Sequence, residues 1–197
     1  MQDHNFFMNR CLSIAKKAKG NVSPNPMVGC VIVARGKIIG EGYHKKYGEE
    51  HAEVNAIRNV TNKKLLKESI LYVNLEPCTH FGNTPPCTNL IIKHKIPKVV
   101  IGCIDVFPKV AGKGIKIMQE AGIKIIYGIL ENQCYKLNKR FTTFHTKKRP
   151  YIILKWAESN DGFIAPKNQN SAFWMTSNKS KKLVHKYRAD EDAILIG

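Results

Sequence analysis

The chain of 197 residues is poor in acidic side chains, with 15 Asp and Glu residues against 32 Lys and Arg residues. It also lacks any apolar run near the ~18 residues of a membrane-spanning helix. Met1 to Asn5 do not begin a signal peptide, and no internal repeat or low-complexity tract stands out. These absences favour a cytoplasmic protein without a membrane segment. The length predicts one domain plus a fragment.

Cysteine is sparse, and its six copies do not show the spacing of a disulfide framework. We interpret four of them as scattered, reduced thiols: Cys11, Cys30, Cys103 and Cys134. The other two follow prolines, at Pro77-Cys78 and Pro86-Cys87. They therefore stand apart from the rest.

A histidine and a carboxylate precede these two thiols, in His51-Ala52-Glu53. H-x-E followed by P-C-x-x-C is typical of zinc deaminases that act on nucleobases. Here eight residues, 79–86, separate the cysteines instead of two. Zinc favours a tetrahedron of nitrogen and sulfur ligands, and a catalytic site has three protein ligands plus a water. We therefore predict that His51, Cys78 and Cys87 bind one catalytic Zn²⁺.

Glu53 lies two residues beyond the histidine and is predicted to act without binding the metal. Zinc lowers the pKa of a bound water from about 15.7 to about 7, which makes hydroxide available at neutral pH. A neighbouring carboxylate can take the water proton, pass it to a ring nitrogen and later help ammonia to leave. Glu53 is thus the predicted general acid and base.

Local patterns place these residues at the ends of secondary-structure elements. An apolar-rich stretch predicts a helix over 51–60, and 69–75 is typical of a buried strand that leads to Cys78. A second helix is predicted to begin at Pro85-Pro86-Cys87, because proline suits a first helical turn. Two helix starts and one strand end would then meet at the metal.

Other interpretations of these residues stay open from the sequence. An isolated histidine and two cysteines can be ordinary packing residues. A structural zinc site is normally four-coordinate. His80, in the loop between the cysteines, is the residue that could supply the fourth ligand.

The remaining elements predict a three-layer α/β/α sandwich. A helical stretch over 4–19 precedes two strands, 28–34 and 37–43, which the short turn Arg35-Gly36 joins as a hairpin. A strand at 99–102, a helix through 115–121 and a strand at 123–126 follow, and 129–146 is predicted to be helical. Strands that alternate with helices predict a mostly parallel sheet past the hairpin.

Four segments together resemble a known family. They are Asn25-Pro26-Met27-Val28-Gly29-Cys30-Val31-Ile32-Val33, Gly42-Tyr43-His44, His51-Ala52-Glu53-Val54 and Glu76-Pro77-Cys78-Thr79-His80-Phe81-Gly82-Asn83-Thr84-Pro85-Pro86-Cys87. Residues 1–146 resemble the deaminase domain of the bifunctional riboflavin-biosynthesis deaminase/reductase. The resemblance implies a cytidine-deaminase-like fold and hydrolytic deamination of 2,5-diamino-6-(ribosylamino)-4(3H)-pyrimidinone 5′-phosphate to the pyrimidinedione. It also implies zinc binding by His51, Cys78 and Cys87, with Glu53 as proton donor.

The resemblance assigns further residues to the substrate. Asn25 and His44 match family positions that approach the base, and Asp105 is available for the ribose hydroxyls. Asn83 stands where the family usually has Lys or Arg. The segment Asp105-Val106-Phe107-Pro108 departs from the common Asp-Pro-Asn-Pro, and Lys109 or Lys113 lies near it for charge.

After the basic stretch Lys147-Lys148-Arg149-Pro150, residues 147–197 resemble the N-terminal fragment of the family's reductase domain. The implied fold is a dihydrofolate-reductase-like α/β domain that uses NADPH. Glu158 and Trp174 match cofactor-facing positions, and Arg188 matches a substrate-facing one. We expect a strand, a helix capped by Ser177 and a strand, and no reductase activity from so short a piece. Because full-length family members associate with one another, the resemblance also implies a homo-oligomer for the full-length protein.

The net charge of +17 allows more than one explanation. It would steer a phosphate-bearing substrate, and it can equally reflect solubility or compositional bias. We expect a small pyrimidine ribonucleotide as the partner. A zinc deaminase that acts on bases in tRNA or DNA is the second hypothesis for the function. A zinc-stabilised, non-catalytic interaction domain is the third.

Overall fold

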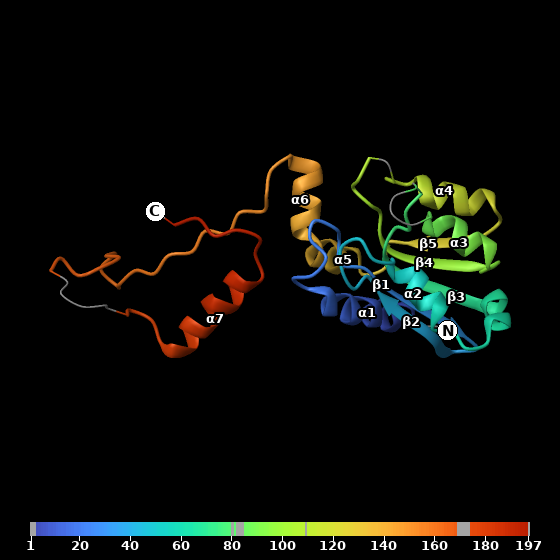
Figure 1. Cartoon of the computed structure of the whole chain (residues 1–197), viewed down its shortest axis with the longest axis horizontal. Helices are drawn as coiled ribbons and strands as arrows, with labels where there is room; N and C mark the ends of the chain where they lie inside the picture. The colour runs from blue at the N-terminus through green and yellow to red at the C-terminus, as the bar shows by residue number, and fades with distance from the viewer. Residues whose placement is uncertain (1–2, 80, 82–84, 109, 169–173, 197) are drawn as a thin grey trace. The chain divides into compact units, whose positions relative to one another are not determined.

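The computed structural model describes residues 3–79, 81, 85–108, 110–168 and 174–196. The chain divides into two compact units, Met1–Pro150 and Tyr151–Gly197, which are described separately (Figure 1). No helix within the described ranges is both long enough and apolar enough to cross a membrane.

The first unit is built on one five-stranded sheet with the strand order β2-β1-β3-β4-β5. Its strands are β1 (Gly29–Ala34), β2 (Lys37–Tyr43), β3 (Ser69–Leu75), β4 (Lys98–Cys103) and β5 (Lys124–Tyr127). β1 runs antiparallel to β2 and to β3, whereas β3, β4 and β5 are parallel. Arg35 and Gly36 form the predicted hairpin turn, both with positive φ angles. The predicted hairpin and mostly parallel sheet are confirmed.

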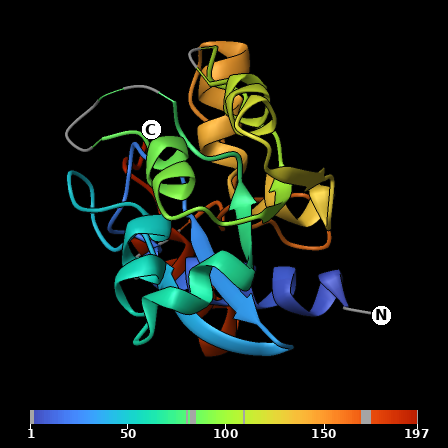
Figure 2. The ribbon, with the colours of Figure 1, turned by 90° about the vertical axis from the view of Figure 1, so that its right-hand side faces the viewer.

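Helices cover both faces of this sheet (Figure 2). The helices are α1 (His4–Ala15), α2 (Ala52–Arg58), α3 (Cys87–Lys93), α4 (Lys113–Glu120), α5 (Glu131–Leu137) and α6 (Lys139–Lys147), with short 3-10 helices η1 (Lys16–Ala18) and η2 (Lys63–Glu68). Buried side chains of α2, α3 and α4 form one apolar core with one face of the sheet. Those of α1 and α5 form a second core on the other face. The predicted three-layer arrangement is confirmed.

Strand β1 is buried along its whole length, which shows why helices must cover both faces of the sheet. Cys30 and Ile32 belong to the core under α2, while Val31 and Val33 belong to the core under α1. Side chains alternate between the two faces of a strand. A continuous apolar run is therefore the pattern of a strand inside a three-layer sandwich.

Helix α2 lies very close to β2 because two positions of that strand have no side chain. A Cβ atom on Gly42 would lie 2.4 Å from the backbone nitrogen of Ala56, and one on Gly40 would lie 2.6 Å from the Ala56 carbonyl oxygen. Glycine removes that overlap. The close contact fixes the helix whose first residues carry the predicted active site.

The predicted helical region over 129–146 forms two helices, α5 and α6, that are separated at Asn138. The Asn138 side chain is turned to the loop before β1, where its Oδ1 accepts a hydrogen bond from Met27 N (2.8 Å) and its Nδ2 donates to Met27 O (3.0 Å). A buried amide with both groups paired stabilises the break. It also fixes the loop that contains Asn25.

The second unit contains helix α7 (Asn178–Ala189), and Ser177 is its N-cap, as predicted: its side chain accepts a hydrogen bond from Ser180 N at 3.2 Å. The two predicted strands around this helix are wrong for the described part of 151–197, which contains no strand. A strand needs a paired neighbour. Leu154 and Leu195 are instead exposed, at 77% and 99%.

Candidate metal centre and catalytic pocket

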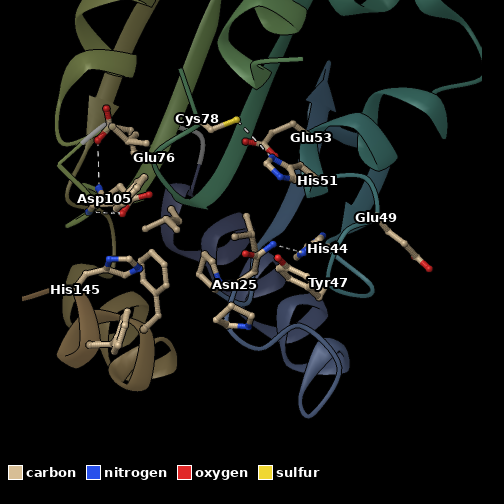
Figure 3. A pocket seen from close by; sticks show the side chains of 18 of the residues that line it. Asn25, His44, Tyr47, Glu49, His51, Glu53, Glu76, Cys78, Asp105 and His145 are labelled. Atoms are coloured by element: carbon tan, nitrogen blue, oxygen red, sulfur yellow. Dashed lines mark hydrogen bonds between the residues drawn. The ribbon is translucent and has the colours of Figure 1, made fainter. Parts of the chain in front are cut away.

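Three elements bring the predicted metal ligands together. His51 is the N-cap residue of α2, Cys78 follows the end of β3, and Cys87 is the first residue of α3. The His51 Nδ1 atom lies 3.5 Å from the Cys78 Sγ atom and 3.4 Å from the Cys87 Sγ atom. All three ligand atoms lie within 4.8 Å of one another. Figure 3 shows His51 and Cys78 turned toward each other.

This spacing suits a tetrahedral zinc ion. Zinc lies about 2.3 Å from a thiolate sulfur and about 2.0–2.1 Å from an imidazole nitrogen, so tetrahedral angles place sulfur and nitrogen about 3.5 Å apart. The two observed sulfur–nitrogen distances match that value. The donor set of one nitrogen and two sulfurs also leaves a fourth position for water.

Hydrogen bonds hold the two cysteine side chains in place. The backbone N–H of Cys87 donates to Cys78 Sγ (3.4 Å), and Thr88 N donates to the Cys78 carbonyl oxygen (3.3 Å). Hydrogen bonding from the Cys87 side chain and from His51 lowers the pKa of Cys78 to about 4. The bond with Cys78 raises the pKa of His51. These contacts favour the thiolate form of Cys78, which is the form that binds a metal.

Glu53 is in the first turn of α2, two residues after His51, and its side chain is buried. Together with His51 and Cys78 it lines the wall of one pocket (Figure 3). Burial raises the pKa of Glu53, while the nearby His51 opposes that shift. A raised pKa makes the carboxyl group a better proton acceptor when it is ionised, which suits a residue that must both take and give a proton.

The pocket has a volume of about 450 Å³. Asn25 and His44 lie on its wall as a bonded pair: the Asn25 Nδ2 and His44 Nε2 atoms are 3.1 Å apart, and His44 Nδ1 lies 3.0 Å from the Glu50 carbonyl oxygen. His44 Nδ1 must donate to that carbonyl, so Nε2 accepts from the amide. The Asn25 amide is thereby oriented, and its oxygen can accept a hydrogen bond from a base.

Asp105 follows β4 and also lines the pocket. Its Oδ1 accepts a hydrogen bond from Phe107 N (2.8 Å), and burial raises its pKa to about 6. Lys113 begins α4, and its Nζ donates to the Pro108 carbonyl oxygen (3.1 Å). The other residues predicted for this region, His80, Asn83 and Lys109, lie outside the described residues.

Glu76 lines the pocket as well, and sequence reasoning assigned it no role. Its buried carboxylate accepts four backbone N–H groups: Oε2 from Asp105 (3.2 Å) and Gly112 (2.9 Å), and Oε1 from Gly114 (2.9 Å) and Ile115 (3.3 Å). Its place two residues before Cys78, in a motif, was the available signal. Glu76 ties the strand end that carries a metal ligand to the loop that carries Asp105.

We expect Glu76→Gln to lower the free energy of unfolding by about 2 kcal/mol or more. Glutamine keeps the shape but points an amide N–H₂ at two backbone donors, and unsatisfied buried donors are costly. Urea denaturation measures the change. Glu68→Gln, which removes an exposed partner of Arg35, is the matched control and should shift stability by no more than about 0.5 kcal/mol. Equal stabilities for the two variants would contradict this role for Glu76.

Helix α6 supplies an aromatic end of the pocket, which sequence reasoning also missed. Phe141, Phe144 and His145 line the cavity there together with Phe107. Their spacing on α6, three and four residues apart, places them on one face of the helix. That spacing was visible in the sequence, but nothing local showed which surface the face would meet.

The residues predicted for the reductase segment lie in the second unit. Trp156 Nε1 donates to Glu158 Oε2 (3.2 Å), and Lys181 Nζ lies 4.1 Å from the centre of the Trp174 ring. Arg188 is exposed on α7.

The three-layer sandwich brings one histidine, two cysteines and a buried glutamate together beside a pocket. This is the arrangement of a zinc-dependent nucleobase or nucleotide deaminase. Residues 1–103 match the family model of the cytidine and deoxycytidylate deaminase zinc-binding region. The chain belongs to this deaminase family. Residues 150–197 match the RibD C-terminal domain.

Relatives confirm the resemblance to the bifunctional riboflavin-biosynthesis proteins. The chain is 47% identical over 191 residues to riboflavin biosynthesis protein RibD of Aquifex aeolicus, covering 97% of this chain and 53% of the relative. The RibD protein of Synechocystis is 44% identical, with coverage of 96% and 51%. The chain thus spans about half the length of the curated relatives it matches.

Solved structures give the same result. Acinetobacter baumannii RibD superposes with a TM-score of 0.87 at 39% identity, covering 94% of this chain and 51% of that one. The deaminase/reductase from Thermotoga maritima has a TM-score of 0.85 at 44% identity, with coverage of 94% and 52%. The predicted cytidine-deaminase-like fold is confirmed.

Proposed function

We propose that this chain catalyses the zinc-dependent hydrolytic deamination of a diaminopyrimidinone that carries a ribosylamino group with a 5′-phosphate, a step of riboflavin biosynthesis. The observation that carries this proposal is the cluster of His51, Cys78 and Cys87 beside buried Glu53; all of these except Cys87 line one pocket. The relatives named riboflavin biosynthesis protein support the substrate class.

His51, Cys78 and Cys87 would hold the zinc ion. When bound, zinc supplies a water whose pKa is near 7. Deprotonated to thiolates, Cys78 and Cys87 would offset the charge of the dication, and the backbone N–H of Cys87 keeps Cys78 in place. The protein would thus hold the water that zinc supplies beside the pocket that His51, Cys78 and Glu53 line.

Glu53 would move the protons. It takes a proton from the attacking water and passes it to a ring nitrogen as the new carbon–oxygen bond forms. It then takes the proton of the new hydroxyl group and delivers it to the departing amino group, so that the hydroxyl becomes a carbonyl, the carbon–nitrogen bond breaks and ammonia leaves. The Asn25 and His44 pair would orient the base for this attack.

Residues 147–197 would contribute to a reductase domain, with Glu158 and Trp174 toward NADPH and Arg188 toward the substrate. The match to the RibD C-terminal domain supports this assignment. We also propose a cytoplasmic location, because all six cysteines are free and thiol ligands need a reducing compartment. Assembly as a homo-oligomer would follow the resemblance to full-length family members.

Ammonia release tests the proposed substrate. The 197-residue chain, supplied with zinc, is expected to release one ammonia per molecule of the ribosylated pyrimidine phosphate. A tRNA substrate assayed in parallel should release none, since the proposed ligand is a free nucleotide. Release from tRNA alone would overturn the proposal in favour of a nucleic-acid deaminase.

A further inference from the structure

The aromatic end of the pocket is organised around His145. The centre of its ring lies 4.4 Å from that of Phe141, 4.9 Å from Phe107 and 5.3 Å from Phe144. In Figure 3, His145 lies across the pocket from His51 and Glu53. Three aromatic rings therefore hold one imidazole in place opposite the metal centre.

His145 differs from the other two histidines that line the pocket. The His51 Nδ1 atom faces both thiols, and the two ring nitrogens of His44 face Asn25 and the Glu50 carbonyl oxygen. Within the described ranges, neither ring nitrogen of His145 has a hydrogen-bond partner. A neutral imidazole always carries one N–H donor. His145 thus has a donor available for a ligand.

The chain around His145 carries positive charge. The segment 139–149 contains five basic residues and no acidic one: Lys139, Arg140, Lys147, Lys148 and Arg149. A positive field raises the local concentration of anions. Burial and the charge of Lys148 lower the pKa of His145, and an anion bound beside the ring would oppose that shift. This end of the pocket suits an anionic group.

The chemistry of the proposed reaction places such a group there. The carbon that loses its amino group must reach the metal centre at His51 and Glu53. The ribosylamino group is attached across one ring nitrogen from that carbon, so the sugar and its phosphate extend away from the metal. Asp105 lines the pocket near His145 (Figure 3), and a carboxylate there is suited to the ribose hydroxyls.

We propose that His145 is a specificity-determining residue that donates a hydrogen bond to the 5′-phosphate of the substrate, with Phe107, Phe141 and Phe144 fixing its ring. The inference rests on the proposed function, since it assigns the far end of the same substrate. His145 takes no part in the chemical step.

Two substrates that differ only in the phosphate test this assignment: the ribosylated pyrimidine phosphate and its dephosphorylated nucleoside. His145→Leu, which keeps an apolar side chain among the rings, should raise KM for the phosphorylated substrate by about tenfold or more. KM for the nucleoside should change by less than about twofold, and kcat by less than about threefold. His145→Gln, which restores an N–H donor, should recover most of the loss.

Lys37→Gln is the matched control, because Lys37 is exposed at the start of β2 and does not line the pocket. It should leave both KM values within about twofold. Equal increases in KM for both substrates in His145→Leu, or no change in either, would overturn the proposal. The same increase in Lys37→Gln would assign the effect to general charge and also overturn it.

A measurement on the unmodified chain does not depend on how the variants fold or on turnover. Ribose 5-phosphate should shift the ring resonances of His145 in nuclear magnetic resonance spectra, and ribose should not. Shifts of other histidines alone would overturn the proposal. If the chain deaminates neither substrate, the proposed function fails, while this binding result still decides the role of His145.

Discussion

Replacing Glu53 by Gln is expected to reduce the rate of ammonia release at least ~100-fold while the zinc content stays at one per chain. Glutamine preserves the size of the buried side chain but cannot take the proton of the attacking water. Glu53 is not one of the three predicted ligands, so its loss should leave the metal in place. Steady-state rates and metal analysis by mass spectrometry measure both effects.

Glu120→Gln provides the charge-matched control for this change. Glu120 ends α4 on the surface, where its carboxylate pairs loosely with Lys116, 3.9 Å away. We expect wild-type turnover from it within about twofold. Unchanged turnover in Glu53→Gln would remove Glu53 from the mechanism. Loss of zinc would instead show that Glu53 supports the metal.

The variant Cys78→Ala is expected to lose both zinc and activity. A catalytic site with three protein ligands cannot lose one thiolate without a large loss of affinity. Hydrogen bonds with Cys87 and His51 also lower the pKa of Cys78, which favours the thiolate form that binds a metal. Zinc content after dialysis, together with ammonia release, measures the result.

Cys11→Ala is the control for removing a buried thiol. Cys11 belongs to α1, in the core on the other face of the sheet from α2 and α3, and its Sγ donates to the Tyr72 carbonyl oxygen. This variant should keep one zinc per chain, although its stability can fall. If Cys78→Ala also keeps a full complement of zinc, the ligand assignment is wrong.

The sequence predicted the metal cluster well because each part of it has a local signature. His51 and Glu53 lie in one short motif, and Cys78 and Cys87 each follow a proline at an element boundary. The structure brings His51, Cys78 and Cys87 within 4.8 Å of one another. Alternating strands and helices likewise predicted the layers and the parallel part of the sheet.

The aromatic end of the pocket could not be predicted because it depends on tertiary packing. Phe107 and His145 are far apart in sequence, yet their rings lie 4.9 Å apart. The break at Asn138 turns α6 toward the site, and its partner, Met27, is more than a hundred residues away. Such contacts leave no local pattern.

The role of Glu76 and the error in the second unit have the same origin. Glu76 was visible only as part of a motif, because the four N–H groups that it accepts come from a later loop and helix. The segments around α7 have β-forming side chains such as Ile152 and Ile194. The preference of these side chains for extended backbone was not enough to form strands, since a strand forms only where a neighbouring strand pairs with it.

The most direct test of the central claim is ammonia release from the ribosylated pyrimidine phosphate by chain that has been stripped of metal with a chelator and then reconstituted. We expect the stripped chain to release no ammonia. Activity should return in proportion to added zinc and reach its maximum at one zinc per chain. Full turnover by the metal-free chain, or zinc binding without any turnover, would contradict the assignment of this site as a catalytic zinc centre.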